Sequence, residues 1–529
     1  MSRSEGQYDA IPAAFRAVAR ERGAQPVILG AGPDWTFRDL DRASDGVAAA
    51  LAQAGVGAGD RLGLYCLNSP QFALAYLAIL KAGATVVPIN LMLNPREIAF
   101  ILDDAGAKAL FYHADLAETA ARARAETPGL AFAVRIGGGE ADGDALLEDL
   151  VESGGQPPSP QIDPDEQLAA ILYTSGTTGR PKGAMLTHRN LMANAASIVQ
   201  ALALSPGQDR MLVVLPMFHA FAATVGMLTP LVHGLSLVPV GRFDPKLVSA
   251  AIEDHQATVF LGVPSMYSLL LRLDAETLSQ WRSVRYCVSG GAAMPRAVMA
   301  AFEERFGIPV LEGDGPTECS PVTCVTPLAG RRKPGSVGIP IPGVEMRIAA
   351  PDGTSREDGE HGEVCVRGPN VMKGYWGLPE ETRQSFFENW FRTGDLGYRD
   401  ADGYFFLVDR IKDLIITNGM NVYPRMIEEV LYRHPAVAEA AVVGEPHDLH
   451  GEIPLAFVVA KPGAEPEPAE LREWCREHLG RHEIPRRILL RESLPKNAAG
   501  KILKRELRRH GELERGVDNP LTPGAGSES

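Results

Sequence analysis

Residues 173–183 are rich in glycine, hydroxyl and basic side chains, which is the composition of a loop that holds a polyphosphate. An apolar run at 168–172, typical of a strand, precedes them. Glycines let backbone N–H groups converge on an anion, and a helix expected just beyond Lys182 would add its N-terminal dipole. The candidate phosphate-binding residues, with Lys182 as their cation, are Thr174, Ser175, Gly176, Thr177, Thr178 and Gly179.

The order of residues in this loop differs from that of a Walker loop. A Walker loop needs Gly-Lys followed by serine or threonine, whereas here Lys182 precedes Gly183. An ordinary P-loop kinase or GTPase is therefore disfavoured. A solvated turn between a strand and a helix would have a similar composition, so the interpretation needs support from other motifs.

A second segment, residues 312–318, ends in a hydroxyl and a carboxylate, those of Thr317 and Glu318. Oxygen ligands of this kind suit Mg²⁺ beside the phosphates of a nucleotide. Together the two segments favour a site for a nucleotide with its metal ion.

These segments and residues 391–396, 409–413 and 494–503 resemble the motifs of the adenylate-forming superfamily, which includes acyl-CoA synthetases, luciferases and nonribosomal peptide adenylation domains. Their joint order across residues 168–501 is far more specific than any one motif. The resemblance implies an α/β fold with a large multi-subdomain N-terminal adenylation domain of layered sheets and helices. It also implies a small mobile α+β C-terminal domain, with the active site between the two.

The resemblance implies roles for residues at the phosphates and the ribose. Thr317 would lie near the α-phosphate, and Glu318 would bind Mg²⁺ with Thr174 as a second ligand. Asp395 would accept hydrogen bonds from both ribose hydroxyls, and Arg410 would lie at the ribose and phosphate.

The adenine site departs from the family's pattern at one position. The family usually has an aromatic residue where this chain has Asp314, between Gly313 and Gly315, and a carboxylate does not replace the stacking face. Asp314 is expected either to hydrogen-bond the adenine amino group or to face solvent, and both alternatives stay open here. On the opposite wall, the main chain at Gly291 and Ala292 is expected to pack on the base.

Other implied roles concern catalysis and domain movement. Lys501 would bridge the substrate carboxylate and the α-phosphate, and its charge would offset that of the transition state, as would the charge of Lys182. Lys412 would be the pivot between two domain orientations. Gly419 would leave room for the pantetheine of CoA.

Residues 216–221 resemble the segment at which amino-acid-activating relatives carry an aspartate for the substrate ammonium. This chain has His219 there, and an uncharged imidazole beside Phe218 and Phe221 suits a carboxylic acid without an α-amine. We therefore also count His219 among the catalytic candidates. Small side chains between residues 220 and 226 either leave room for an apolar tail or allow close helix packing.

The leading expectation is an ATP-dependent carboxylate–CoA ligase that uses ATP, Mg²⁺ and CoA and acts on a medium- or long-chain fatty acid. One alternative is an acyl-AMP ligase that loads a carrier protein. Another is a nucleotide-binding homologue without turnover, which the aspartate in the adenine site would favour. Aromatic, branched and dicarboxylic acids remain open as substrates, and a luciferase-like use of the adenylate has no signal of its own.

Composition excludes several other classes. A net charge of −14 with no dominant basic stripe argues against nucleic acid as a partner. The six cysteines show neither disulfide nor zinc spacing and are expected to be reduced thiols. No apolar leader or membrane span is expected, so the chain is expected to be cytoplasmic. Peripheral membrane contact and a homodimer are left open.

The elements that must position these residues alternate between helical patterns and short apolar runs up to about residue 310, which predicts α/β structure. Thr36 is expected to cap a helix at 36–54, and Pro95 to begin another at 95–104. Residues 137–165 are expected to be surface loop. The expected domains are 1–410, with a β-rich subdomain at 340–410, and 411–515, followed by a disordered tail at 516–529.

Overall fold

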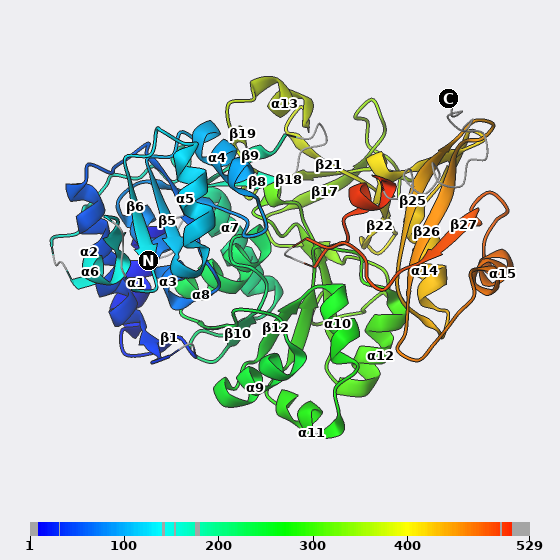
Figure 1. The fold of residues 1–529 in the computed structure, drawn as a ribbon, viewed down its shortest axis with the longest axis horizontal. Helices are drawn as coiled ribbons and strands as arrows, with labels where there is room; N and C mark the ends of the chain where they lie inside the picture. The colour runs from blue at the N-terminus through cyan, green and yellow to red at the C-terminus, as the bar shows by residue number, and fades with distance from the viewer. Residues whose placement is uncertain are drawn as a thin grey trace, which may run out of the picture.

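The computed structural model describes residues 9–30, 32–139, 143–152, 155–174, 180–497 and 500–509 of the 529-residue chain. They form a large N-terminal domain of mixed α/β structure and a small C-terminal domain, which confirms the expected fold class (Figure 1). The core of the large domain extends to Phe405, whereas a separate core of the small domain begins at Ile415. The boundary at residue 410 agrees with these cores and stays a prediction. The expected tail at 516–529 lies outside the described residues.

One sheet of the large domain is built around the parallel strands β10, β12, β13 and β14. Their carboxyl ends meet at one edge of the sheet, which is where open α/β sheets bind ligands. Three of these strands end at Gly262, Ser289 and Asp314. In spatial order the strands are β16 (Ile339–Pro340), β15 (Cys324–Val325), β14 (Val310–Asp314), β13 (Tyr286–Ser289), β12 (Val259–Gly262), β10 (Arg210–Val213), β11 (Ser236–Pro239), β1 (Pro26–Ile28) and β2 (Trp35–Thr36).

A second sheet carries the predicted phosphate loop. Its strands β8 and β9 pair antiparallel, and the register places Thr174 opposite Lys182, so the loop joins two neighbouring strands. Residues 175–179 of the loop lie outside the described residues. In spatial order the strands are β19 (Gly374–Tyr375), β9 (Lys182–Thr187), β8 (Leu168–Thr174), β4 (Thr85–Pro88), β3 (Arg61–Tyr65), β5 (Ala109–His113), β6 (Phe132–Ile136) and β7 (Ala145–Leu146).

Helix starts follow the capping signals in the sequence. The Thr36 hydroxyl accepts a hydrogen bond from the backbone of Asp39, whose carboxylate accepts one from the backbone of Thr36, so α2 begins as predicted. Pro95 is the first residue of α4, as predicted. The longer helices of the large domain are α1 (Ile11–Arg22), α2 (Phe37–Gln53), α3 (Pro70–Lys81), α4 (Pro95–Asp104), α5 (Ala117–Ala125), α7 (His188–Ala201), α9 (Pro245–His255) and α12 (Arg296–Phe306).

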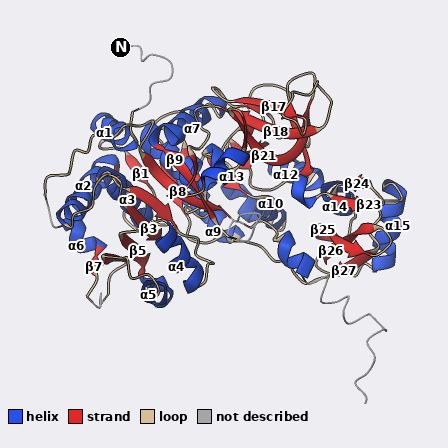
Figure 2. Ribbon diagram, turned by 90° about the horizontal axis from the view of Figure 1, so that it is seen from above, coloured by secondary structure: helices blue, strands red, loops and turns tan. Residues whose placement is uncertain are grey.

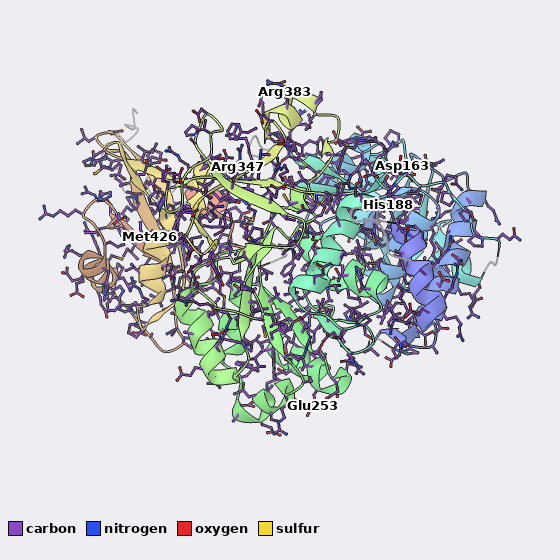
Figure 3. All side chains as sticks on the ribbon, turned by 180° about the vertical axis from the view of Figure 1, so that it is seen from behind. Asp163, His188, Glu253, Arg347, Arg383 and Met426 are labelled. Carbon is purple, nitrogen blue, oxygen red and sulfur yellow. The ribbon has the colours of Figure 1, made fainter. Side chains whose placement is uncertain are left out.

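The prediction of a helix just beyond Lys182 is wrong. Residues Lys182–Thr187 form β9, which lies between β8 and β19 and pairs with both. The helix α7 begins only at His188, which Figure 3 labels, and the Thr187 hydroxyl caps it. Pairing with strands distant in sequence decides the conformation of this segment. The dipole of a helix therefore does not assist Lys182.

The expected β-rich subdomain at 340–410 contains several strands, among them the long strand β21, which the sequence patterns did not reveal. Its strands are β17 (Glu345–Ala349), β18 (Gly362–Arg367), β21 (Trp390–Arg399), β20 (Phe386–Phe387) and β22 (Phe405–Arg410).

The prediction of loop throughout residues 137–165 is wrong in part. This stretch contains β7 and α6 (Leu147–Glu152), because Leu147 is buried in the core of the large domain. The Gly- and Pro-rich residues on either side led to the prediction of a loop and made this short apolar segment hard to recognise.

The small domain is an α+β unit at the opposite end of the molecule from α2 and α6 (Figure 2). Its sheet packs against helices α14 (Pro424–Tyr432) and α15 (Pro468–His478). In spatial order its strands are β24 (Met420–Val422), β23 (Ile415–Thr417), β26 (Gly451–Ala460) and β25 (Val437–His447), with β27 (Arg487–Leu490) beside β26.

The six cysteines are all buried as free thiols, as expected. Among the described residues, no helix combines the length and apolar character needed to cross a bilayer.

Candidate active site

Asp395 and Arg410 form the ion pair at the centre of the candidate site. They face each other across the antiparallel strands β21 and β22, and Arg410 Nε lies 2.9 Å from Asp395 Oδ1. Directly opposed residues in such strands have side chains in reach of each other, so the sheet fixes the pair. Asp395 is 7% exposed, and its negative charge raises the pKa of Arg410. A cation therefore stays beside the carboxylate proposed to bind the ribose.

The small domain brings Lys501 to this pair. The residue before it, Gly500, packs on the segment that follows β12, where the Ser265 hydroxyl donates a hydrogen bond to the Gly500 carbonyl at 3.4 Å. Gly500 has a φ of +81°, and an added Cβ would lie 3.0 Å from both Ser265 Oγ and Val263 Cγ2. The close approach therefore requires glycine at this position.

Lys501 is partly open to solvent, and charges of both signs act on it. Removal from water and the nearby Arg410 lower the pKa of Lys501, while Asp395 and Asp314 favour its ammonium form. The cations Arg410 and Lys412 and the carboxylates Asp395 and Asp314 thus all act on this ammonium.

We expect the rate of acyl-AMP formation to fall at alkaline pH earlier than for an ordinary lysine. The protonated form of Lys501 exists below its pKa, and that pKa is lowered, so the charge is lost as pH rises through the lowered value. Rates of pyrophosphate release between pH 7 and 11 would measure this alkaline decrease in rate. Lys501→Arg should remove it, because a guanidinium stays charged there. An identical alkaline decrease in the wild type and in Lys501→Arg would contradict the role of Lys501.

Asp314 is half-buried at the end of β14. Burial and the charge of Asp395 raise the pKa of Asp314, whereas Arg410 and Lys501 lower it. Its carboxylate therefore belongs to the same charged group, and a hydrogen bond to adenine stays a proposal.

A second cluster joins the predicted metal ligands. Thr174, the last residue of β8, donates a hydrogen bond from its hydroxyl to Glu318 Oε1 at 3.4 Å. The hydroxyl of Tyr375 donates to the same oxygen at 2.9 Å, and Lys182 Nζ lies 5.3 Å from the Tyr375 ring centre. Four side chains from β8, β9, β19 and the turn after β14 thus converge.

The donor set of this cluster fits Mg²⁺. Glu318 and Thr174 offer a carboxylate and a hydroxyl close together, both hard oxygen ligands, and Mg²⁺ completes its shell with phosphate oxygens and water. Among the described residues no group of three or more histidine, cysteine or carboxylate side chains could hold a metal by itself.

Sequence reasoning missed Tyr375. It reaches the site because β19 pairs with β9, which sets Tyr375 opposite Ala184. Its position beside Gly374 and Trp376 carries no motif, so only the pairing of distant strands reveals it.

Tyr375→Phe is expected to raise the Mg²⁺ concentration that half-saturates acyl-AMP formation by about tenfold. The lost hydroxyl orients Glu318, and partners that orient a ligand typically contribute about 10- to 100-fold to metal affinity or activity. Pyrophosphate release at varied MgCl₂ would measure the shift. The control is Tyr112→Phe, which removes a 2.7 Å hydrogen bond to Asp144 outside the site. Equal Mg²⁺ dependence in both variants would contradict the role.

His219 lies in apolar surroundings next to the sheet edge. Burial lowers its pKa to about 4, and its ring centre is 4.6 Å from that of Phe218. The imidazole is therefore uncharged at neutral pH, in agreement with the sequence argument. Phe221 lies against the end of β13, because a Cβ added to Gly290 would be 3.1 Å from its ring.

The small residues after His219 allow close packing at one position at least. Residues Ala222–Leu228 form a π-helical segment, and a Cβ on Gly226 would lie 2.9 Å from Val213 of β10. Gly226 thus lets the segment approach the sheet and does not leave space there.

The other predicted nucleotide residues line the same sheet edge. Gly291 has a φ of +76° and follows β13 together with the half-buried Ala292. Gly313 lies near the end of β14. Gly315 follows that strand, and Thr317 and Glu318 lie in the single turn Thr317–Cys319.

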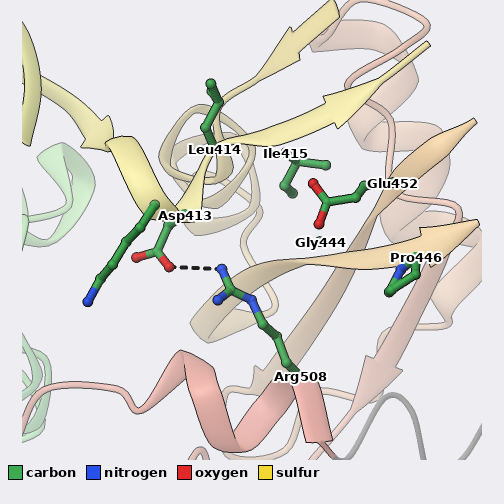
Figure 4. A pocket seen from close by; sticks show the side chains of 8 residues that line it. Asp413, Leu414, Ile415, Gly444, Pro446, Glu452 and Arg508 are labelled. Atoms are coloured by element: carbon green, nitrogen blue, oxygen red, sulfur yellow. Dashed lines mark hydrogen bonds and ion pairs between the residues drawn. The ribbon is translucent and has the colours of Figure 1, made fainter. Parts of the chain in front are cut away.

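Lys412 and Gly419 lie on the small-domain side of the ion pair. Lys412 is exposed in the turn Ile411–Asp413 and lines a cavity of about 170 Å³, shown in Figure 4, in which Arg508 pairs with Asp413 at 2.8 Å. Gly419, with a φ of +76°, is exposed at the turn between β23 and β24. The roles as pivot and as pantetheine passage stay predictions.

Comparison with known proteins identifies the family of the chain. The family model described as AMP-binding enzyme matches residues 15–376, and the model described as AMP-binding enzyme C-terminal domain matches residues 426–501. The solved anthranilate CoA ligase in complex with anthranoyl-AMP superposes with a TM-score of 0.90 at 30% identity, over 96% of this chain and 98% of that one.

Curated relatives differ in their acids. A feruloyl-CoA synthase of Amycolatopsis sp is 37% identical over 90% of this chain and 93% of its own. A long-chain-fatty-acid–CoA ligase of Bacillus subtilis is 34% identical over 90% of each chain. A sulfoacetate–CoA ligase of Cupriavidus necator is 36% identical over 95% of this chain and 98% of its own. With both family models matched in order around a shared site, the chain belongs to the family of AMP-binding enzymes and is an acid–thiol ligase.

Proposed function

We propose that this protein converts a medium- or long-chain fatty acid into its CoA thioester through an acyl-AMP intermediate. The observation that carries the acyl-AMP route is the contact of Gly500, next to Lys501, with Ser265 of the large domain, together with the mutual charge effects of Lys501, Asp395 and Arg410. ATP and CoA are the co-substrates, and Mg²⁺ would be held by Glu318 and Thr174.

In the first half-reaction, a carboxylate oxygen of the acid attacks the α-phosphorus of ATP and pyrophosphate leaves. Asp395 accepts hydrogen bonds from the ribose hydroxyls, which fixes the nucleotide. Lys501 lies between the carboxylate and the α-phosphate and offsets the negative charge that develops there. Mg²⁺, when bound, neutralises phosphate charge and favours the departure of pyrophosphate. Lys182 acts on the same phosphates.

In the second half-reaction, the thiolate of CoA attacks the acyl carbon and AMP leaves. Lys501 has no role at the acyl carbon, so the small domain would turn at Lys412 and withdraw it. The turn β23–β24, with Gly419 at its tip, would then approach the adenylate. Movement of a domain between two steps also excludes water from the reactive intermediate.

The surroundings of His219 support an acid without an amino group. His219 is an uncharged imidazole and offers no negative charge to bind a substrate ammonium. The neighbouring side chains Phe218 and Phe221 are apolar and suit a hydrocarbon. A fatty acid satisfies both conditions. An aromatic acid also fits apolar walls, and relatives named for ferulate and anthranilate make it the main competitor.

Two other functions use the same fold. An acyl-AMP ligase would pass the adenylate to a carrier protein, and a nucleotide-binding homologue would not turn over. The contacts of Lys501, Glu318 and Asp395 support turnover over the second alternative, because the proposed acyl-AMP formation uses all three side chains.

Mass spectrometry of the products tests the proposal. The protein would be incubated with Mg-ATP and equal concentrations of octanoate, palmitate, ferulate, benzoate and sulfoacetate, with CoA or a holo-carrier protein. We expect acyl-CoA from the fatty acids at a kcat/KM at least tenfold above that for the aromatic acids. Preference for an aromatic acid would overturn the substrate class, and acyl-AMP that reacts only with the carrier would overturn the acceptor.

The proposed setting is the cytoplasm, which supplies ATP and CoA. A fatty acid as substrate is compatible with peripheral membrane contact. That contact and a homodimer stay predictions.

A further inference from the structure

Helix α14 of the small domain presents two charged residues to the large domain. Arg425 and Glu429 are four residues apart, so they lie on one face of the helix. Met426, which Figure 3 labels, lies between them in sequence and is exposed. In Figure 1, α14 lies close to α12 of the large domain. The polar contacts that follow join residues on either side of the expected domain boundary.

Arg425 is tied to the large domain at three points. Its backbone N–H donates to Asp409 Oδ2 at 2.9 Å, and its Nη1 donates to the carbonyl of Leu407 at 2.7 Å. Its Nη2 lies 3.9 Å from Glu312 Oε1 on β14. The side chain of Arg425 is only 14% exposed, so these contacts exclude most water.

Glu312 depends on Arg425 for its neutralising charge. The side chain is 2% exposed, its Oε1 accepts a hydrogen bond from the Met294 backbone at 3.1 Å, and its Oε2 has no hydrogen-bond partner within the described part of the chain. Burial raises the pKa of Glu312 to about 7, and Arg425 is the main influence that lowers it. A buried carboxylate without a cation is costly, so the position of Arg425 matters to the large domain.

Glu429 makes a second contact one turn further along. The backbone of Arg296, the first residue of α12, favours the charged form of the Glu429 carboxylate. Burial raises the pKa of Glu429, and Arg425 and Arg296 oppose that shift. A carboxylate at the N-terminus of a helix is favourable, because the first N–H groups lack partners within the helix.

We propose that this face of α14 is a latch that holds the small domain in the orientation for acyl-AMP formation, with Arg425 and Glu429 as positioning residues for Lys501. The inference rests on the proposed two-step function. A turn about Lys412 would separate Arg425 and Glu429 from Glu312, Asp409 and Arg296, because the two groups lie on opposite sides of the pivot.

Charged contacts suit a latch that must also release. A buried ion pair adds little net stability over an apolar contact, because desolvation offsets much of the attraction, yet removal of one partner is strongly unfavourable. Such contacts therefore specify one orientation without making it permanent. An apolar interface of similar size would hold the domain more tightly and would expose hydrophobic surface to water after the small domain rotates.

Separate assays of the two half-reactions test the latch. Arg425→Met keeps the length of the side chain and removes its charge and hydrogen bonds. We expect at least a tenfold loss in the rate of acyl-AMP formation from acid and ATP. The rate at which supplied acyl-AMP and CoA give acyl-CoA should stay within twofold of wild type or increase.

Two further variants distinguish loss of the latch from a general folding defect. Glu312→Gln with Arg425→Met removes the stranded carboxylate and should slow acyl-AMP formation about as much as Arg425→Met alone, because coupled contacts are not additive. Arg285→Met is the matched control, since it breaks a 2.8 Å ion pair with the 3% exposed Asp209 inside the large domain. It should not separate the two half-reactions.

The outcomes distinguish the latch from the function on which it rests. A wild-type protein that forms no acyl-AMP from any acid would overturn the proposed function. If the wild type is active, an equal loss in both half-reactions in Arg425→Met and in the double variant would overturn the latch. Unchanged acyl-AMP formation in both variants would overturn it as well.

Discussion

Lys501→Ala is expected to slow acyl-AMP formation by about 10²- to 10³-fold, the usual effect of removing one group that stabilises transition-state charge. Lys501 is the cation that the small domain delivers to the Asp395–Arg410 pair. Alanine leaves the hydrogen bond from the Ser265 hydroxyl to the Gly500 carbonyl in place, so the loop should still dock. Rapid-quench measurement of acyl-AMP in one turnover would give the rate.

The second half-reaction separates loss of chemistry from loss of structure. Lys501→Ala should still convert supplied acyl-AMP and CoA to acyl-CoA at nearly the wild-type rate. Lys496→Ala, on the same C-terminal segment, is the control, because Lys496 pairs with Glu439 within the small domain at 2.6 Å. An equal loss in Lys496→Ala, or a change of less than fivefold in Lys501→Ala, would contradict the catalytic role.

Gly315→Ala is expected to abolish acyl-AMP formation and to destabilise the large domain by about 2 kcal/mol or more, in the range of overpacked buried sites. An added Cβ would lie 1.7 Å from the Pro321 carbonyl oxygen and 2.9 Å from Thr323 N. These are backbone atoms, so the turn that holds Thr317 and Glu318 would have to move. Thermal unfolding and pyrophosphate release would measure the two effects.

Gly313→Ala is the matched control for that substitution. It lies two residues earlier on the same strand, and an added Cβ there would come no closer than 3.2 Å to any atom, the Cys324 carbonyl oxygen. We expect a much smaller loss of stability in thermal unfolding. Similar melting temperatures for the two variants would show that the turn after β14 tolerates a side chain.

Local signals predicted local structure well. Thr36 and Pro95 begin helices where the sequence places them, because a cap and a fixed φ act within one turn. The apolar run at 168–172 located β8 of the second sheet. The strand at 182–187 was missed because its conformation depends on pairing with β8 and β19.

The site was predicted by motif and not by geometry. Nothing in the spacing of Asp395, Arg410 and Lys501 requires them to meet, and the resemblance to a family supplied that expectation. Tyr375 and the pair Glu312 and Arg425 were not found, because each acts through a contact between segments far apart in sequence. The choice of acid depends on the shape of apolar walls, which residue types alone do not give.

The measurement that tests the central claim most directly follows oxygen from the acid into the nucleotide product. Palmitate labelled with ¹⁸O in both carboxylate oxygens would be converted with Mg-ATP and CoA, and the AMP analysed by mass spectrometry. If the carboxylate attacks the α-phosphorus and the thiol then attacks the acyl carbon, each AMP carries one ¹⁸O. Unlabelled AMP, or ADP with labelled phosphate, would contradict the acyl-AMP route and with it the role of Lys501.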